Sequence, residues 1–248
     1  MGQPVEKRLS EYLELQRDRI AKTAKASKKD PSSKNVHQLR VSLRRLKTAV
    51  WMGRHSSQKL KTAGLPSALG KTSSRLGKVR DLDVMMGYAE RFHLDSHKLE
   101  SERRKLMKKA RKKIDSDWRH EVLLEVDGIV HRVLEHPGDL SPGIRKVKKN
   151  LARWLKTPVR HANLHGLRIA VKKTRYCLEV LGKPVESLKS LQDLLGQIHD
   201  LENFEARFKR SAQTARLKKV LEQQLFRILG PILVVALKEL GEESRGGT

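Results

Sequence analysis

One stretch of sequence occurs twice in this chain, and the duplication limits the possible folds more than any other feature. The first copy spans residues 35–47 and the second spans residues 163–175, at a constant offset of 128 residues. His37 aligns with His165, and the basic and apolar positions that follow also coincide. Because the offset is close to half of the 248-residue chain, it indicates an internal duplication, and we expect two similar halves.

A second pair of segments supports the duplication. Residues 76–83 read Leu-Gly-Lys-Val-Arg-Asp-Leu-Asp, and residues 195–202 read Leu-Gly-Gln-Ile-His-Asp-Leu-Glu. The offset of this pair is 119 residues, so the spacing between the two motifs differs by nine residues between the halves. A loop of different length in each half would account for this difference.

Apolar residues recur at helical spacing along almost the whole chain, and no segment shows the convincing alternation of a strand. The sequence therefore predicts an all-α fold, with a boundary between the halves at residues 136–139, His-Pro-Gly-Asp. Short connections favour two antiparallel four-helix bundles related by a pseudo-twofold axis. We assign residues 1–248 to a single domain, with half 1 at residues 4–135, half 2 at residues 141–240 and a frayed tail at residues 241–248.

Eight helices are expected within these halves. They span residues 4–26, 35–52, 67–92 and 95–135 in the first half, and 141–156, 163–181, 185–209 and 214–240 in the second. Gly77 could break the third helix, and Pro231 is expected to kink the last one, because proline cannot donate the helical hydrogen bond.

The start of each duplicated helix has two alternatives. Asn35 could cap the first, or Asp30 could cap it with Pro31 at the first helical position. The second copy offers the same choice between Asn163 and Thr157.

On a helix, each copy places two stripes side by side. The apolar stripe of the first copy recurs at spacings of three and four and must pack inward: Val36, Leu39, Leu43, Leu46 and Val50. The basic stripe is rotated by about 100° from it and consists of His37, Arg40, Arg44 and Lys47. The second copy has the apolar stripe Leu164, Leu167, Val171 and Leu178, which Thr174 weakens. Its basic stripe is His165, Arg168, Lys172 and Arg175.

Charge that flanks a core face is suited to lining a groove, whereas solvated charge usually lies on the opposite face. Like charges stacked at i, i+3 and i+4 repel each other by a few tenths of a kcal/mol, and an anion would relieve that repulsion. Two such helices facing each other would line a basic central cleft. Arginine supplies forked donors for phosphate oxygens, and lysine supplies point charge. The simpler alternative is a solvated basic face, with histidines that only cap or pack.

The overall charge indicates a polyanionic partner. The chain carries a formal net charge of +26, and only 4% of its residues are aromatic. A charge of this size bears on partners and solubility, not on the fold. Proteins that bind single-stranded nucleic acid usually stack bases on aromatic side chains, so a partner made of phosphate charge alone suits this composition better.

Other reactive or charged residues have simple structural interpretations. We expect Asp81, Asp83, Asp200 and Glu202 to pair with basic residues or cap helices, although they could also be metal ligands. Eight of the eleven residues in 103–113 are Lys or Arg. This run is expected to be a solvated helix face, with accessory anion binding as the second interpretation. The single cysteine, Cys177, is expected in the core.

The sequence also bears on location. Its N-terminus lacks the apolar run of a signal peptide. The longest apolar run, residues 228–237, is about half of the ~20 residues that a membrane-spanning helix needs. We therefore expect a soluble, cytoplasmic protein without a membrane span.

The two motifs together resemble a known family. The pattern His-x-x-Arg-x-x-x-Arg/Lys-Arg/Lys-x-Lys/Arg is followed by Leu-Gly-x-x-x-Asp-Leu-Asp/Glu, and both occur twice in this order. This combination resembles the CHAD family, the conserved histidine α-helical domain, over residues 5–240. The resemblance implies an all-helical fold of two four-helix bundles with a basic central channel. It also implies binding of inorganic polyphosphate, often at polyphosphate granules.

The resemblance implies a set of binding residues. The family motif carries over onto His37, Arg40, Arg44, Arg45, Lys47, His165, Arg168, Lys172, Lys173 and Arg175. Arg45 and Lys173 fall on a different face from the basic stripes. Lys71, Arg75 and Lys78, spaced by four and three residues, extend the predicted site. No catalytic residue, metal ligand or cofactor is expected.

CHAD domains are often fused to a CYTH-type triphosphate tunnel enzyme, which needs a β-barrel and a Glu-x-Glu-x-Lys strand. The nearest match here is residues 100–104, Glu-Ser-Glu-Arg-Arg, which lies in a helical pattern and ends in arginine. We therefore expect a stand-alone CHAD protein that lacks this route to catalysis.

Three functions remain to be separated. The first is non-catalytic binding of inorganic polyphosphate in the basic cleft, with targeting to polyphosphate granules. The alternative is a nucleic-acid-binding protein that uses the same basic surface. The third is an enzyme that hydrolyses or transfers phosphate, which would need a metal site or a nucleophile with its base. The sequence leaves the oligomeric state open.

Overall fold

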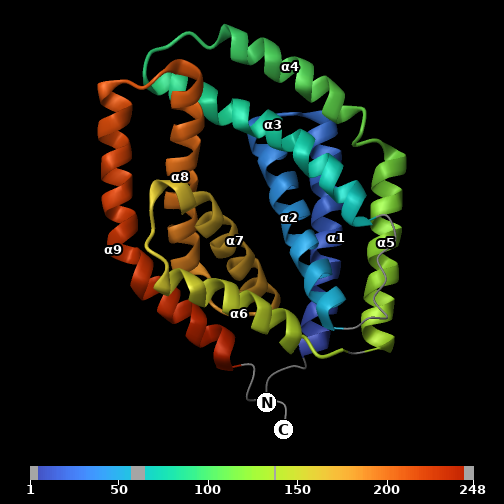
Figure 1. The fold of residues 1–248 in the computed structure, drawn as a ribbon. Helices are drawn as coiled ribbons and strands as arrows, with labels where there is room; N and C mark the ends of the chain where they lie inside the picture. Colours follow the sequence, from blue (N-terminus) through green and yellow to red (C-terminus); the bar gives the residue numbers. More distant parts are fainter. Residues whose placement is uncertain (1–4, 57–64, 137, 243–248) are drawn as a thin grey trace. The chain divides into compact units, whose positions relative to one another are not determined.

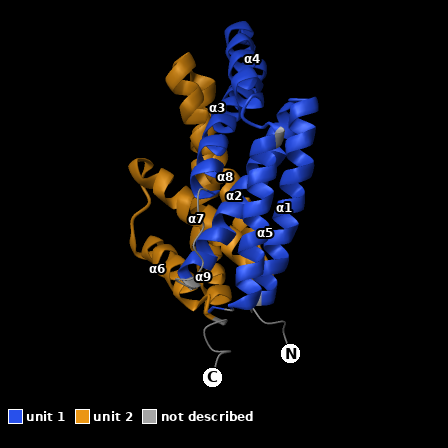
Figure 2. Ribbon diagram, turned by 90° about the vertical axis from the view of Figure 1, so that its right-hand side faces the viewer, with its two compact units in different colours: residues 1–138 blue, residues 139–248 orange. Residues whose placement is uncertain are grey.

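The computed structural model describes the chain except for residues 1–4, 57–64, 137 and 243–248. The described residues form helices and connecting turns and contain no strand, which confirms the all-α prediction (Figure 1). The chain divides into two compact units, residues 1–138 and residues 139–248 (Figure 2).

Unit 1 contains five helices within its described residues. They are α1 (Val5–Lys29), α2 (Ser33–Ser56), α3 (Leu65–Arg91), α4 (His97–Arg111) and α5 (Ser116–Glu135). α1 packs against α2 and α5, α2 packs against α3, and α3 packs against α4. α2, the helix that carries the first duplicated motif, therefore lies between α1 and α3.

Burial of the predicted apolar stripe explains how α2 is oriented. Val36, Leu39, Leu43 and Leu46 are fully buried, and Val50 is almost fully buried. A helix with such a stripe minimises its exposed apolar surface in only one rotation about its axis. The basic stripe beside it therefore lies at the edge of the core, as the sequence predicts.

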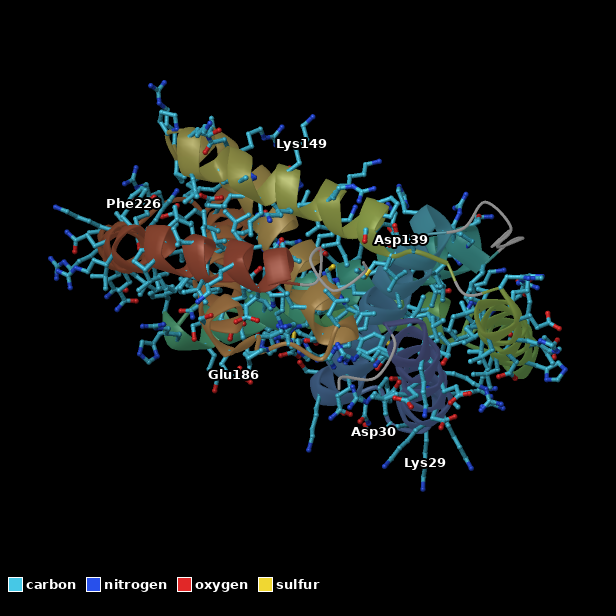
Figure 3. All side chains as sticks on the ribbon, turned by 90° about the horizontal axis from the view of Figure 1, so that it is seen from below. Lys29, Asp30, Asp139, Lys149, Glu186 and Phe226 are labelled. Carbon is cyan, nitrogen blue, oxygen red and sulfur yellow. The ribbon has the colours of Figure 1, made fainter. Side chains whose placement is uncertain are left out.

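The turn before each duplicated helix is built in the same way. Asn35 Nδ2 donates to the backbone oxygen of Asp30 at 2.8 Å, in the turn whose residues Lys29 and Asp30 are labelled in Figure 3. Asn163 Nδ2 donates to the backbone oxygen of Pro158 at 2.9 Å. Both bonds reach back five residues, so the duplication extends to the turn.

The predicted helix starts are only partly correct. α2 begins at Ser33, so neither Asn35 nor Asp30 is its cap, and Asp30 instead orders the turn. In unit 2, Asn163 does occupy the cap position, whereas Thr157 ends the preceding helix. The described helices also extend beyond the predicted ends, to Lys29 in α1 and to Ser56 in α2.

Two predictions about helix breaks are wrong. The expected single helix over residues 95–135 is two helices, α4 and α5, separated at residues 112–115. Asp115 causes the restart, because its extended backbone and its carboxylate, which accepts from the Trp118 backbone N–H at 2.8 Å, form an N-cap. Conversely, α3 runs through Gly77 without a break.

Unit 2 contains four α-helices and one short 3-10 helix in the part that the structure describes. They are α6 (Ser141–Lys156), η1 (His161–Asn163), α7 (Leu164–Val180), α8 (Glu186–Phe208) and α9 (Ala212–Glu242). α7 packs against α6 and α8, and α9 packs against α8 and α6. The predicted seam of α7 is buried at Leu164, Leu167, Val171 and Leu178, and Thr174 is buried with it.

α9 differs from the other helices in its apolar content. It continues through Pro231, and its ribbon is bent (Figure 1). By length and composition, residues 212–241 could cross a membrane, a property that the count of consecutive apolar residues did not predict. One such helix is weak evidence for a membrane span, because the core helix of a soluble protein meets the same criterion. Leu225, Leu233 and Leu240 of α9 are fully buried within unit 2.

Candidate anion-binding site

The basic residues of α2 lie at different depths. His37 and Lys47 are exposed, Arg44 and Arg45 are half-buried, and Arg40 is 9% exposed. The three additional cations predicted on α3, namely Lys71, Arg75 and Lys78, are all exposed.

Arg40 fixes α2 against α3. Its Nη1 donates to the backbone oxygens of Gly77 at 2.7 Å and Leu76 at 3.2 Å, and lies 3.7 Å from a carboxylate oxygen of Asp81. A β-carbon on Gly77 would lie 3.6 Å from this nitrogen, an ordinary van der Waals distance, so the guanidinium packs directly on this turn of α3. Arg40 thus joins the first duplicated motif to the second. Its contact with a bound anion stays a prediction.

A groove of about 600 Å³ lies between α1 and α2. His37 and Arg45 line it from α2, together with Lys34, and Arg19 and Lys22 line it from α1. Arg19, Lys22 and Lys34 are exposed and form no ion pair with a carboxylate in the described part of the chain. His37 therefore shares a cationic groove with Arg45, although the sequence placed these two residues on different faces.

In unit 2, the motif histidine lies beside a second histidine. The ring centroids of His165 and His199 are 5.7 Å apart, and His199 belongs to the second motif on α8. His165 is exposed, whereas His199, Arg168 and Lys172 are half-buried. α7 and α8 therefore both contribute side chains to one cationic cluster.

Burial and the neighbouring cations lower the pKa of His199. The largest cause is burial, followed by repulsion from Arg168, His165 and Lys172, while Glu202 acts in the opposite direction. Asn203 Nδ2 lies 3.2 Å from His199 Nε2, a distance at which the amide can donate to an unprotonated ring nitrogen. A phosphate group among these cations would offset the repulsion and favour protonation of His199.

The remaining two predicted residues of α7 face other parts of unit 2. Burial, followed by repulsion from Lys146 of α6, lowers the pKa of Lys173. Arg175 is 9% exposed, pairs with Glu179 at 3.0 Å and lies over the ring of Tyr176. Its counterpart in α2, Lys47, is exposed, so the two copies differ at this position. Binding of an anion by Lys173 or Arg175 stays a prediction.

The acidic residues that end the second motifs form ion pairs. Asp83 pairs with Arg103 of α4, and Arg103 Nη2 also donates to the backbone oxygen of Pro31 at 2.8 Å. In unit 2, Glu202 pairs with Lys218 of α9 at 3.1 Å and with His161 at 2.9 Å. In unit 1 Arg103 joins α3 and α4 to the turn before the duplicated helix, whereas in unit 2 Glu202 itself contacts both α9 and the turn residue His161.

These contacts support the structural interpretation of the acidic residues. Asp81 and Asp83 pair with arginines, and Glu202 pairs with Lys218 and His161. Over the described residues, no group of three or more His, Cys, Asp or Glu side chains could hold a metal ion. Cys177 is fully buried, as predicted, and burial raises the pKa of its thiol to about 12.

Sequence reasoning missed two parts of the site. It did not select His199, although the alignment of residues 76–83 with 195–202 matches it to Arg80 and could have indicated it. It also missed the cations that α1 contributes to the groove beside His37. Nothing in the duplicated motif indicates them, because only the packing of α1 on α2 brings them there.

The contacts of Arg40 give a prediction about stability. Arg40→Met keeps the aliphatic stem but removes the hydrogen bonds to α3, so we expect a loss of about 1–3 kcal/mol in the free energy of unfolding. Lys47→Met, an exposed change on the same helix, should alter it by less than about 0.5 kcal/mol. Urea denaturation of both variants measures the difference, and equal effects would contradict the positioning role of Arg40.

The lowered pKa of His199 gives a prediction about pH. The unfolded chain binds a proton at this residue first, because an unfolded histidine has a pKa of about 6.5. Protonation therefore favours unfolding, and stability falls as the pH drops below that value. Between about pH 7.5 and 5.5, wild type should lose more stability than His199→Gln. His120→Gln, an exposed change on α5, should keep the wild-type slope, and identical slopes for all three proteins would contradict the prediction.

Comparison with known proteins identifies the family. Residues 11–209 match the family model described as the CHAD domain. The chain is similar to the crystal structure of the CHAD domain from the plant Ricinus communis, with a TM-score of 0.68 and 18% identity, over 96% of this chain and 91% of that one. It is also similar to PptA from Streptomyces chartreusis, with a TM-score of 0.50 and 15% identity, over 97% and 100% of the two chains. No curated protein sequence matches. At these low identities, the two structural similarities show a shared fold alone. Because the family model spans the helices from α1 to α8, the chain belongs to the CHAD domain family.

Proposed function

We propose that this protein binds inorganic polyphosphate without hydrolysing it, through the basic residues of α2 and α7. The observation that carries the proposal is the duplicated helix, in which a buried apolar seam holds a histidine-headed basic stripe at the edge of the core in each unit. The resemblance to the CHAD family implies the same ligand. We also propose a cytoplasmic location at polyphosphate granules.

Electrostatics supports a phosphate chain as the ligand. The net charge of +26 attracts any polyanion, and the half-buried Arg44, Arg168 and Lys172 attract it more strongly than exposed charges would. Binding should release counterions, by analogy with nucleic acids, so the affinity should fall steeply with salt concentration. Arginine contributes directional pairs of donors that point charges lack.

Several features favour polyphosphate over nucleic acid. The groove between α1 and α2 is lined by no aromatic residue other than His37. Aromatic residues make up only 4% of the chain, and three of them, Trp154, Tyr176 and Phe204, are buried. A ligand without bases needs no stacking platform, whereas single-stranded nucleic acid usually does.

Other features support binding without catalysis. Cleavage of a phosphoanhydride bond needs an activated water or a nucleophile with its base. Of the four acidic residues that could have supplied metal ligands, Asp81, Asp83 and Glu202 are held in ion pairs. The Cys177 thiol is buried with a pKa of about 12, so it does not form the thiolate that acts as a nucleophile.

The predicted site can be tested by a charge-matched comparison. Replacing Arg44, Lys47, Arg168 and Lys172 by glutamine should weaken polyphosphate binding about tenfold or more and reduce its salt dependence. Replacing the exposed lysines Lys7, Lys98, Lys189 and Lys238 by glutamine removes the same charge elsewhere and should weaken binding less than about threefold. Isothermal titration calorimetry at about 0.15 M salt measures both affinities. Equal losses of affinity in the two variants would show that binding depends on total charge and not on the residues of α2 and α7.

A competition experiment separates the alternative function. Polyphosphate bound to wild-type protein is challenged with excess duplex DNA and, separately, with RNA. Retention of polyphosphate supports the proposal, whereas efficient displacement would favour a nucleic-acid-binding protein.

The proposal that polyphosphate is bound without being hydrolysed has its own test. Incubation of the protein with polyphosphate and Mg²⁺ or Mn²⁺ should release no phosphate above the protein-free control. Sustained release in proportion to the protein concentration would overturn this part of the proposal and leave the binding result unaffected.

A further inference from the structure

A second basic groove in unit 1 lies outside the duplicated helices. It measures about 650 Å³ and lies between the end of α1 and the side of α4 that carries Arg103 and Lys108. Its cationic lining residues are Lys28, Arg103, Arg104, Lys108, Arg111 and Lys112. The groove therefore contains much of the basic run at residues 103–113, which the sequence alone interpreted mainly as a solvated helix face.

One arginine holds this groove in place. The Arg103 guanidinium pairs with Asp83 of α3 and donates to the backbone oxygen of Pro31 in the α1–α2 turn. Its side chain is only 17% exposed, and that of Asp83 is 2% exposed. The Arg103 bridge thus attaches α4 both to α3 and to the turn that precedes α2. Arg104, Lys108 and Arg111 therefore project from a helix that is held in place.

The remaining cations of the groove outnumber its one acidic lining residue, Asp115. Lys28, Arg104, Lys108, Arg111 and Lys112 are exposed, and within the described chain none of them pairs with a carboxylate. Asp115, the one acidic residue of the lining, has its carboxylate engaged in capping α5. Like charges spaced by three and four residues on a helix repel each other, so an anion in the groove would stabilise this arrangement.

The chemistry of the groove favours a bare phosphate chain. Its lining contains no aromatic side chain on which a base could stack. The apolar face of α4 is buried at Leu99, Met107 and Ala110, so the helix has no free apolar face to insert into a lipid surface. What the groove offers a ligand is cationic donors along about 14 Å of helix, from Arg103 to Lys112.

Both basic grooves of unit 1 have lining residues close to the α1–α2 turn. Ala26 and Lys34, on either side of that turn, line the groove that contains His37. Lys28 and Pro31, within that turn or next to it, line the groove along α4. A chain that leaves the first groove would have to pass around this turn to reach the second.

We propose that the groove along α4 is a second polyphosphate-binding site, which holds the continuation of a chain bound beside α2. This inference rests on the proposed function. A short chain occupies only one groove, whereas a long chain occupies both, and the second contact forms at high effective concentration. The α4 groove thus makes the protein prefer long chains over short ones.

Two charge-matched variants test the proposal. The groove variant replaces Arg104, Lys108, Arg111 and Lys112 by glutamine and leaves Arg103 intact. The control variant replaces Lys98, Lys105, Lys109 and Lys113, which are equally exposed on or beside α4 but do not line the groove. Glutamine has nearly the helix propensity of lysine and arginine, so both variants should fold, which circular dichroism and the thermal midpoint verify.

Affinity is measured for tripolyphosphate and for polyphosphate of about one hundred units. The groove variant should bind tripolyphosphate like wild type but bind the long chain about tenfold more weakly. The control variant should keep both affinities within about threefold. Equal losses in the two variants, or an unchanged long-chain affinity in the groove variant, would overturn the proposal.

A second measurement uses the wild-type protein alone. Long-chain polyphosphate should slow acetylation of Lys108 and Lys112 more than that of Lys105 and Lys109, as quantified by mass spectrometry. Equal protection of the two pairs would contradict a groove-specific contact. If RNA protects Lys108 and Lys112 better than polyphosphate does, the occupant is nucleic acid and the proposal fails. If wild type binds neither phosphate chain, the proposed function itself fails.

Discussion

Burial of one apolar stripe on each duplicated helix determines the rest of the arrangement. Each fully buried leucine contributes roughly 1.5–3 kcal/mol, so Leu39, Leu43 and Leu46 together far outweigh any single charge interaction on α2. They fix the rotation of the helix about its axis. The adjacent basic residues are thereby held at the edge of the core, where charge is less screened than on an open face. The same holds for α7, with Leu167 and Val171.

The two copies have diverged in how they use the same residue types. In unit 1, Arg40 is bonded to the backbone of α3 at Gly77. In unit 2, a β-carbon on the aligned Gly196 would meet no side chain of another helix within 4 Å. Arg168 lies beside His199 and contributes to the lowering of its pKa. The arginine of unit 1 therefore joins two helices through a glycine carbonyl, and the arginine of unit 2 adds positive charge beside a histidine.

Which features could be predicted depends mainly on how far apart in the sequence the interacting residues lie. Helical periodicity predicted the all-α fold and the buried seams, because both depend on residues three and four positions apart. It missed the restart at Asp115, where a single side-chain hydrogen bond outweighs the helical pattern around it. It also grouped Arg40 and Arg175 with the exposed cations of the stripes, although both are largely buried and bonded within their own units. The partner of Arg40 lies on another helix, α3, whereas Arg175 pairs with Glu179 on its own helix.

The sequence by itself determined the duplication, the helical class, the strong positive charge and the family, since each is a property of residue types and their spacing. Tertiary structure alone decided which cations are exposed and which are held by the fold. Arg103 belongs to a run of basic residues that look equivalent in sequence, yet it bridges Asp83 and Pro31 while Arg104 remains exposed. The physical reason is that helix packing brings some cations next to partners that are distant in the sequence. Such a cation is bound within the protein, whereas an exposed cation can bind a ligand.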